Sequence, residues 1–143
     1  MDAREIYQAV QRRGRMGSSE EAAAATRMTL QSMAQVLGRQ AAGALAAALP
    51  AELAAELARA PDRPDPLIDR QVFVGPLVNH MDTEYGYDQT VGGLDLVAAY
   101  MDDDAATRMQ AVFATLKERL DAGTQQAVRA ALPPEIRDWW DSA

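Results

Sequence analysis

Leu49-Pro50-Ala51-Glu52-Leu53 sets the plan of this chain, because its pattern returns 83 positions later as Leu132-Pro133-Pro134-Glu135-Ile136. Each copy has an apolar residue, a proline, a spacer, an acid and a second apolar residue. Proline fits the first turn of a helix, where its missing N–H costs no hydrogen bond, and an acid there faces the positive helix end. Each copy therefore predicts the start of a helix, and the recurrence suggests a repeated module.

An alignment at this offset extends the repeat well beyond the motif. Without gaps it pairs residues 18–57 with residues 101–140, and nine of the 40 pairs are identical. The positions expected to face a core stay apolar in both copies: Leu30/Phe113, Met33/Leu116, Leu37/Leu120, Leu45/Val128, Leu53/Ile136 and Leu57/Trp140. We predict a duplicated protein, with convergence of two alanine-rich helical sequences as the alternative.

Three prolines in Ala60-Pro61-Asp62-Arg63-Pro64-Asp65-Pro66 forbid a regular helix there. This segment, residues 60–66, is the predicted linker between a first half of about 1–59 and a second half of about 67–143. A length of 143 residues favours one domain over residues 1–143.

Alanine, leucine, arginine and glutamine are abundant in the composition, and all are strong helix formers. We predict an all-α protein, a compact helical bundle of about 8–9 helices. The expected helices cover about residues 2–13, 20–37, 40–48, 50–57, 67–81, 90–100, 103–120, 124–131 and 133–140.

Two boundaries in the second half depend on short signals. Apolar spacing over 67–81 favours a helix kinked near Gly75 over a strand, and a loop is expected from Asp82 to Gln89. Asp102-Asp103-Asp104 is expected to cap the helix that follows it, as Ser18 with Glu21 caps its counterpart.

The formal net charge of −7 argues against a general nucleic-acid binder, although a helix-turn-helix reader using Arg27 or Arg129 is a remaining alternative. Arg12, Arg13 and Arg15 are best explained as cations at a helix C-terminus. The absence of cysteine excludes disulfides and thiolate chemistry. With no signal-peptide core at the N-terminus and no membrane-spanning run, we expect a cytoplasmic protein.

His80 is the single histidine, and it precedes an acidic, tyrosine-bearing stretch. His80, Asp82, Tyr85, Tyr87 and Asp88 are therefore the candidate ligand-binding residues, around a pocket between the halves. Carboxylates with one imidazole suit several metals, but the spacing lacks the terminal glutamate of a calcium loop. A solvated acidic loop is the simpler explanation of the stretch, so no metal or cofactor is predicted.

Trp139 and Trp140 are the candidate partner-binding residues, because tryptophan combines large apolar area with a polar tip. The alternative is that Trp140 fills the second core, as Leu57 fills the first, while Trp139 lies at an edge. No Gly-x-Ser-x-Gly elbow, Walker-type lysine or convergent polar site is present, so no catalytic residues are assigned.

The repeated plan resembles a bacterial family of unknown function, the one numbered 2267. That plan is an acid-and-alanine helix start, a long amphipathic helix, and a short helix running into Leu-Pro-x-Glu-Leu. The resemblance covers Glu20-Glu21-Ala22 through Leu53 and Asp103-Asp104-Ala105 through Ile136. It implies an all-helical bacterial cytosolic protein and carries no catalytic residues. The tract Gly86 to Asp95, with its Gly-Gly, departs from the family plan.

The leading functional hypothesis is a non-catalytic cytosolic helical module that binds a protein partner or itself. The alternatives are a small-ligand or metal-binding protein using residues 80–94, and a DNA-binding regulator.

Overall fold

The computed structural model describes residues 2–85 and 94–143, with the side chains of residues 83–85 and 94–100 left out of that description. The described residues form seven α-helices and no strand, which confirms the predicted all-α class. The helices are α1 (Ala3–Gly14), α2 (Ser19–Ala47), α3 (Ala51–Ala54), α4 (Arg70–Tyr85), α5 (Leu94–Arg119), α6 (Ala122–Ala131) and α7 (Pro134–Ser142), with a 3-10 turn η1 (Ala55–Leu57) after α3.

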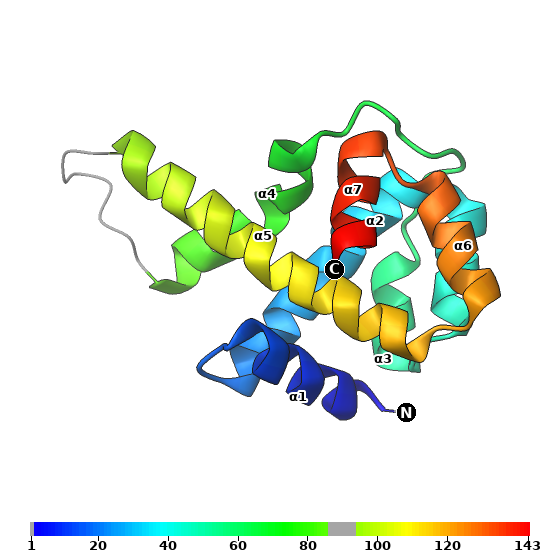
Figure 1. The fold of residues 1–143 in the computed structure, drawn as a ribbon, viewed down its shortest axis with the longest axis horizontal. Helices are drawn as coiled ribbons and strands as arrows, with labels where there is room; N and C mark the ends of the chain where they lie inside the picture. The colour runs from blue at the N-terminus through cyan, green and yellow to red at the C-terminus, as the bar shows by residue number, and fades with distance from the viewer. Residues whose placement is uncertain (1, 86–93) are drawn as a thin grey trace.

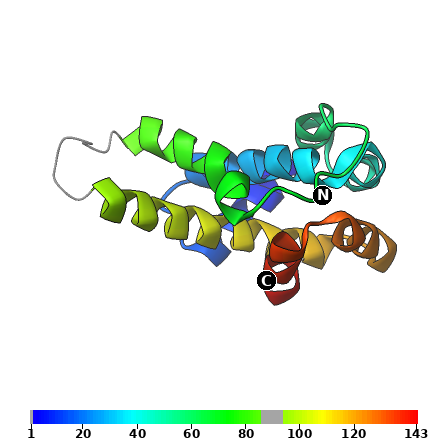
Figure 2. The same cartoon turned by 90° about the horizontal axis from the view of Figure 1, so that it is seen from above.

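The two long helices, α2 and α5, pack against each other in the middle of the bundle (Figure 1). α1 contacts both of them, and so does α4. Beyond Gly38, α2 lies beside α6, while α3 with η1 returns onto α2 and α7 onto α5. Seen from above, α4 and α5 run side by side along the length of the molecule (Figure 2).

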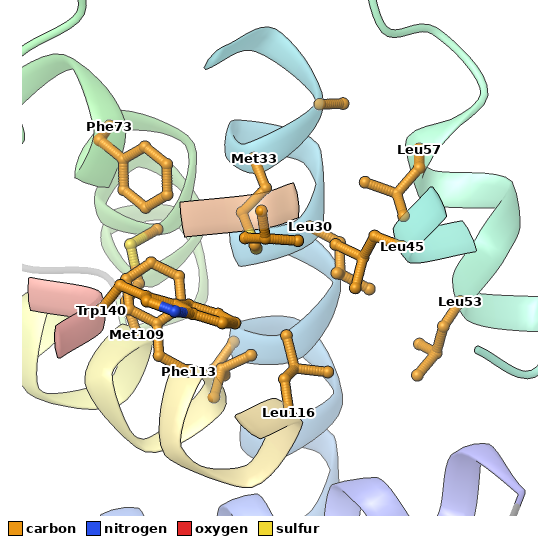
Figure 3. Close-up of a cluster of buried hydrophobic side chains, with 14 of the residues drawn as sticks. Leu30, Met33, Leu45, Leu53, Leu57, Phe73, Met109, Phe113, Leu116 and Trp140 are labelled. Carbon is orange, nitrogen blue, oxygen red and sulfur yellow. The ribbon is translucent and has the colours of Figure 1, made fainter. Parts of the chain in front are cut away.

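One continuous apolar core joins the helices, and both predicted halves contribute to it (Figure 3). All twelve residues of the six predicted core pairs are at most 5% exposed. Phe113 lies at the centre, with ring centroids 5.9 Å from Phe73 and 5.4 Å from Trp140. Such tilted and edge-on arrangements are the favourable geometries for aromatic pairs.

The helix starts follow the sequence signals closely. Pro50 precedes α3 and Pro133 precedes α7, so both copies of the opening motif begin a helix, as predicted. Ser18 Oγ accepts a hydrogen bond from the Glu21 N–H at 3.2 Å. The Glu21 carboxylate, however, accepts from the Gly17 N–H at 2.7 Å, one residue before the position that a reciprocal capping box requires.

The expected loop from Asp82 is wrong at its start, because α4 continues to Tyr85. No glycine or proline occurs between Pro76 and Gly86, so nothing in the chain ends the helix earlier. Residues 67–81 are helical from Arg70 onward, and Asp69 Oδ1 caps this helix by accepting from the Val72 N–H at 2.9 Å.

The expected break before Asp103 is also wrong, since α5 is one helix from Leu94 to Arg119. Residues 94–119 contain no glycine or proline, and the buried face runs straight through the acidic triplet. Within the helix, Asp104 forms an ion pair with Arg108 at 3.4 Å. The apolar face that continues through the triplet therefore outweighs the capping preference of the three aspartates. The next helix is capped by Asp121, which accepts a hydrogen bond from the Thr124 N–H at 2.7 Å.

Gly38 ends the first helical part of α2 at the predicted position, and a second helical part follows it across a kink. Its backbone has φ 77° and ψ 169°, a region open essentially to glycine alone. A Cβ placed on Gly38 would lie 2.6 Å from the Pro64 nitrogen and 2.8 Å from the Arg63 carbonyl carbon. The glycine is thus required twice, by its own conformation and by the approach of the proline linker.

We expect Gly38→Ala to lower the free energy of unfolding by about 2–4 kcal/mol, because it adds backbone strain and a clash with the linker. Gly43→Ala is the matched control: Gly43 lies exposed in the same helix, and a Cβ there meets nothing within 4 Å. The control should raise stability by about 0.5–1 kcal/mol. Chemical denaturation of both variants checks this, and equal effects of the two substitutions would contradict it.

Candidate functional site

Trp139 and Trp140 occupy very different environments, although they are neighbours on α7. Trp140 is 2% exposed and packs edge-on against Phe113, whereas Trp139 is half-buried at the edge of the core. Of the two candidate partner-binding residues, only Trp139 therefore offers surface to another molecule.

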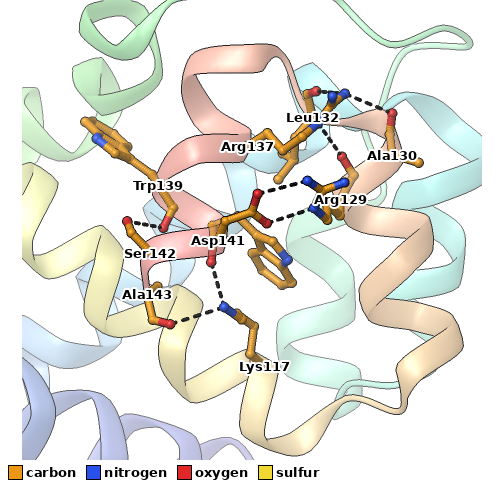
Figure 4. A network of polar contacts seen from close by, with 10 residues as sticks. Lys117, Arg129, Ala130, Leu132, Arg137, Trp139, Asp141, Ser142 and Ala143 are labelled. Carbon is orange, nitrogen blue, oxygen red and sulfur yellow. Dashed lines mark hydrogen bonds and ion pairs between the residues drawn. The ribbon is translucent and has the colours of Figure 1, made fainter.

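A polar network fixes α7, and with it the orientation of Trp139 (Figure 4). Lys117 Nζ donates to the carbonyl oxygens of Trp140, at 2.7 Å, and Ala143, at 3.1 Å. Arg129 donates to both carboxylate oxygens of Asp141, at 2.8 and 3.0 Å. This pairing lowers the pKa of Asp141. It also engages one of the two guanidinium groups, Arg27 and Arg129, that the DNA-reader alternative named.

Arg70, at the start of α4, covers one side of Trp139. Its guanidinium carbon lies 4.8 Å from the indole centroid, within the range of a cation–π contact. Its backbone N–H donates to the Glu135 carboxylate and its Nε–H to the Glu135 carbonyl, both at 3.3 Å. Glu135, from the second copy of the opening motif, therefore fixes α4 against α7.

A cavity of about 430 Å³ opens beside Trp139, between α4, α5 and α7. Its walls combine the indole with two carboxylates and a guanidinium: Trp139, Arg70, Gln71, Val74, Asp102, Asp103 and Ala106. We call this the Trp139 cavity. Binding sites typically place charged groups among apolar walls, and here three apolar residues share the lining with three charged ones and Gln71.

His80 lines a second cavity, of about 340 Å³, formed by the start of α2 together with α4 and α5. Arg27 and Arg108 share this His80 cavity, as do the acidic residues Glu20 and Glu21. The cavity thus brings together an imidazole and two guanidinium groups from three helices, and it lies between the predicted halves.

The other candidate ligand residues are not gathered around His80 by the described structure. Asp82 is half-buried on α4 but does not line the His80 cavity. Tyr85 ends α4, its side chain falls outside the description, and Tyr87 and Asp88 lie outside the described residues. Within residues 2–85 and 94–143, no group of three or more histidine or acidic side chains is placed to hold a metal.

Sequence reasoning missed the partners that define both cavities. Arg70 is 69 positions from Trp139 in the chain, and no local pattern links them. Asp102 and Asp103 were interpreted as helix caps, while Arg108 gave no signal of its own. Arg12 and Arg13 do lie in the last turn of α1, as predicted, and Arg13 forms an ion pair with Glu118.

The first copy of the motif makes a related contact at the other end of the core. Tyr7 on α1 donates a hydrogen bond from its hydroxyl to Glu52 Oε1 at 3.2 Å. Burial, followed by the negative charge of Glu52, raises the pKa of Tyr7 to about 12. Glu52 thus fixes α1 as Glu135 fixes α4.

The chain matches the family described as "Uncharacterized conserved protein (DUF2267)" over residues 3–139. The fold defines the class of protein as an all-helical domain, and the description of the matched family assigns it no function. The match covers nearly the whole chain, so the protein belongs to this family, as its resemblance implied. Comparison with curated proteins gave no match. Among the helices described, none is long and apolar enough to cross a membrane.

We expect an alkaline titration followed by tyrosinate absorbance to show a late transition near pH 12, from Tyr7. Because the folded-state pKa exceeds the ordinary value of 10, this group contributes stability below pH 10 that is lost as pH rises through 12. Tyr7→Phe should remove this late transition, and Glu52→Gln should move it to lower pH. An unchanged titration in Glu52→Gln would contradict the assigned role of the carboxylate.

Proposed function

We propose that this protein is a non-catalytic, cytosolic bacterial module that binds a protein partner, or a second copy of itself, through the surface around Trp139. The supporting observation is the half-buried indole beside the Trp139 cavity, in a chain whose other tryptophan is fully used in the core. Tryptophan is enriched among the residues that dominate binding energy at protein interfaces. The rigid support of α7 presents this side chain in a fixed orientation.

We further propose that the chain is an internal duplication, as its sequence pattern predicts. In support, both members of each core pair are buried. The break at Gly38 in the first half also aligns with Asp121, the boundary between α5 and α6, in the second half. The buried hydroxyl residues Ser32 and Thr115 also occupy paired positions.

The lateral helices add a second line of support for the duplication. α1 and α4 each pack against both long helices, and each donates a hydrogen bond to the glutamate of one motif copy. A two-fold relation between halves 1–59 and 67–143, joined by residues 60–66, accounts for all these correspondences. A single core then requires both halves, because each long helix buries its apolar face on the other.

Replacement of Trp139 tests the interaction role. Trp139→Ala should weaken partner binding or self-association by about 2 kcal/mol, roughly 30-fold, because it removes the central apolar contact. Light scattering after size exclusion measures self-association, and affinity capture with the full chain as bait measures partner binding. Leu67→Ala is the matched control, since Leu67 is 89% exposed and does not line the cavity. A monomeric protein with no Trp139-dependent partner would refute the role.

The His80 cavity supports a second candidate function, the binding of a small ligand or metal between the halves. The observation in its favour is the convergence of His80, Arg27 and Arg108 from three helices on one cavity. Protonated imidazole and two guanidinium groups suit an anionic group, while neutral imidazole suits a metal.

Metal analysis and thermal-shift screening test this second candidate. A bound metal in stoichiometric amount, or a ligand-induced rise in melting temperature that His80→Ala abolishes, is the expected result. Asp88→Ala extends the test to the acidic stretch that follows His80 in the sequence. Gln126→Ala, on the exposed face of α6, is the control. A ligand shift that persists in His80→Ala would exclude the His80 cavity.

A further inference from the structure

The Trp139 cavity is lined by two carboxylates and by one guanidinium, that of Arg70. Asp102 and Asp103 both line it, and neither carboxylate takes part in an ion pair or a hydrogen bond among the described residues. The third acid of the triplet, Asp104, is neutralised by Arg108. The helix-capping role that would have used the first two does not apply, because both lie inside α5.

Arg70 indicates that the Trp139 wall of the cavity accepts a cation. Its guanidinium lies over the Trp139 ring, where the negative face of the indole attracts a cation. Arg70 is bonded to Glu135 through its backbone N–H and its Nε–H, not to the two aspartates. The cavity lining therefore contains one guanidinium, that of Arg70, and two carboxylates, those of Asp102 and Asp103, so its net charge is negative.

We propose that the Trp139 cavity binds an arginine or lysine side chain of a protein partner. The Asp102 and Asp103 carboxylates accept the charged hydrogen bonds of the incoming cation, and Trp139 provides the apolar wall for its aliphatic stem. A volume of about 430 Å³ accommodates such a side chain. This inference rests on the proposed interaction role and adds the chemistry of the partner: a basic segment, complementary to the net charge of −7.

A pair of short peptides provides the probe. Acetyl-Gly-Arg-Gly-Arg-Gly-amide carries two guanidinium groups, and the same peptide with citrulline in place of arginine has the shape without the charge. Titration into the full-length protein is followed by the indole N–H resonances of the two tryptophans. The arginine peptide should shift the Trp139 resonance saturably and the citrulline peptide should not, with the buried Trp140 as internal reference.

Charge variants then separate a site from general attraction to an acidic protein. Asp102→Asn combined with Asp103→Asn should weaken binding of the arginine peptide roughly three- to tenfold. Asp62→Asn combined with Glu118→Gln removes the same charge from exposed positions outside the cavity and should change binding by less than twofold. Arg70→Gln removes a competing cation and should tighten binding, a gain that structural damage would not produce.

Equal weakening in the cavity pair and the control pair would overturn the inference, and so would unchanged binding in the cavity pair. Failure of the proposed interaction role is a different result. If affinity capture finds a Trp139-dependent partner that the Asp102→Asn/Asp103→Asn variant retains, the interaction role holds and the cationic partner is refuted. If the peptide binds through the two aspartates but no Trp139-dependent partner or self-association exists, the cation site holds and the interaction role is refuted.

Discussion

Burial of the apolar faces of α2 and α5 against each other is the interaction on which the remaining structure depends. Leu30 and Met33 on one helix, and Phe113 and Leu116 on the other, are fully buried. Each such side chain contributes on the order of 1.5–3 kcal/mol when it leaves water. The lateral helices α1 and α4 then cover this pair, while α3 packs on α2 and α7 packs on α5.

The glutamate of the repeated motif connects the core to the candidate site. Glu52 and Glu135 each accept a hydrogen bond from a lateral helix, so the motif both begins a helix and fixes the helix that packs beside it. The donors differ: a tyrosine hydroxyl at Glu52, and at Glu135 the backbone N–H of an arginine whose guanidinium also lies over Trp139. The two copies of the motif therefore make similar contacts but have different side chains around them, and the difference is concentrated around Trp139.

Much of the fold could be predicted from local patterns because the signals are strong and short-ranged. The helical class, the two motif-directed helix starts, the bend at Gly38 and the six buried pairs all follow from periodicity, capping and proline chemistry. The predicted helix boundaries were wrong where two local sequence signals favoured different structures. At Asp102-Asp103-Asp104 the capping preference lost to a continuous apolar face, and after Met81 the acidic residues continued a helix that nothing interrupts before Gly86.

The sequence by itself determined that this protein is all-helical, that its core positions recur, and that its opening motif starts a helix twice, because these properties depend on residues within a few turns of one another. It also singled out His80 and Trp139 as unusual side chains. Only the tertiary structure decided what surrounds them. Arg70 reaches Trp139 from another helix, and Asp102 and Asp103 join them from a third. His80 lines one cavity with Arg27 and Arg108, which come from two other helices. Contacts between such distant segments depend on how the helices pack, and no pattern along the chain specifies them.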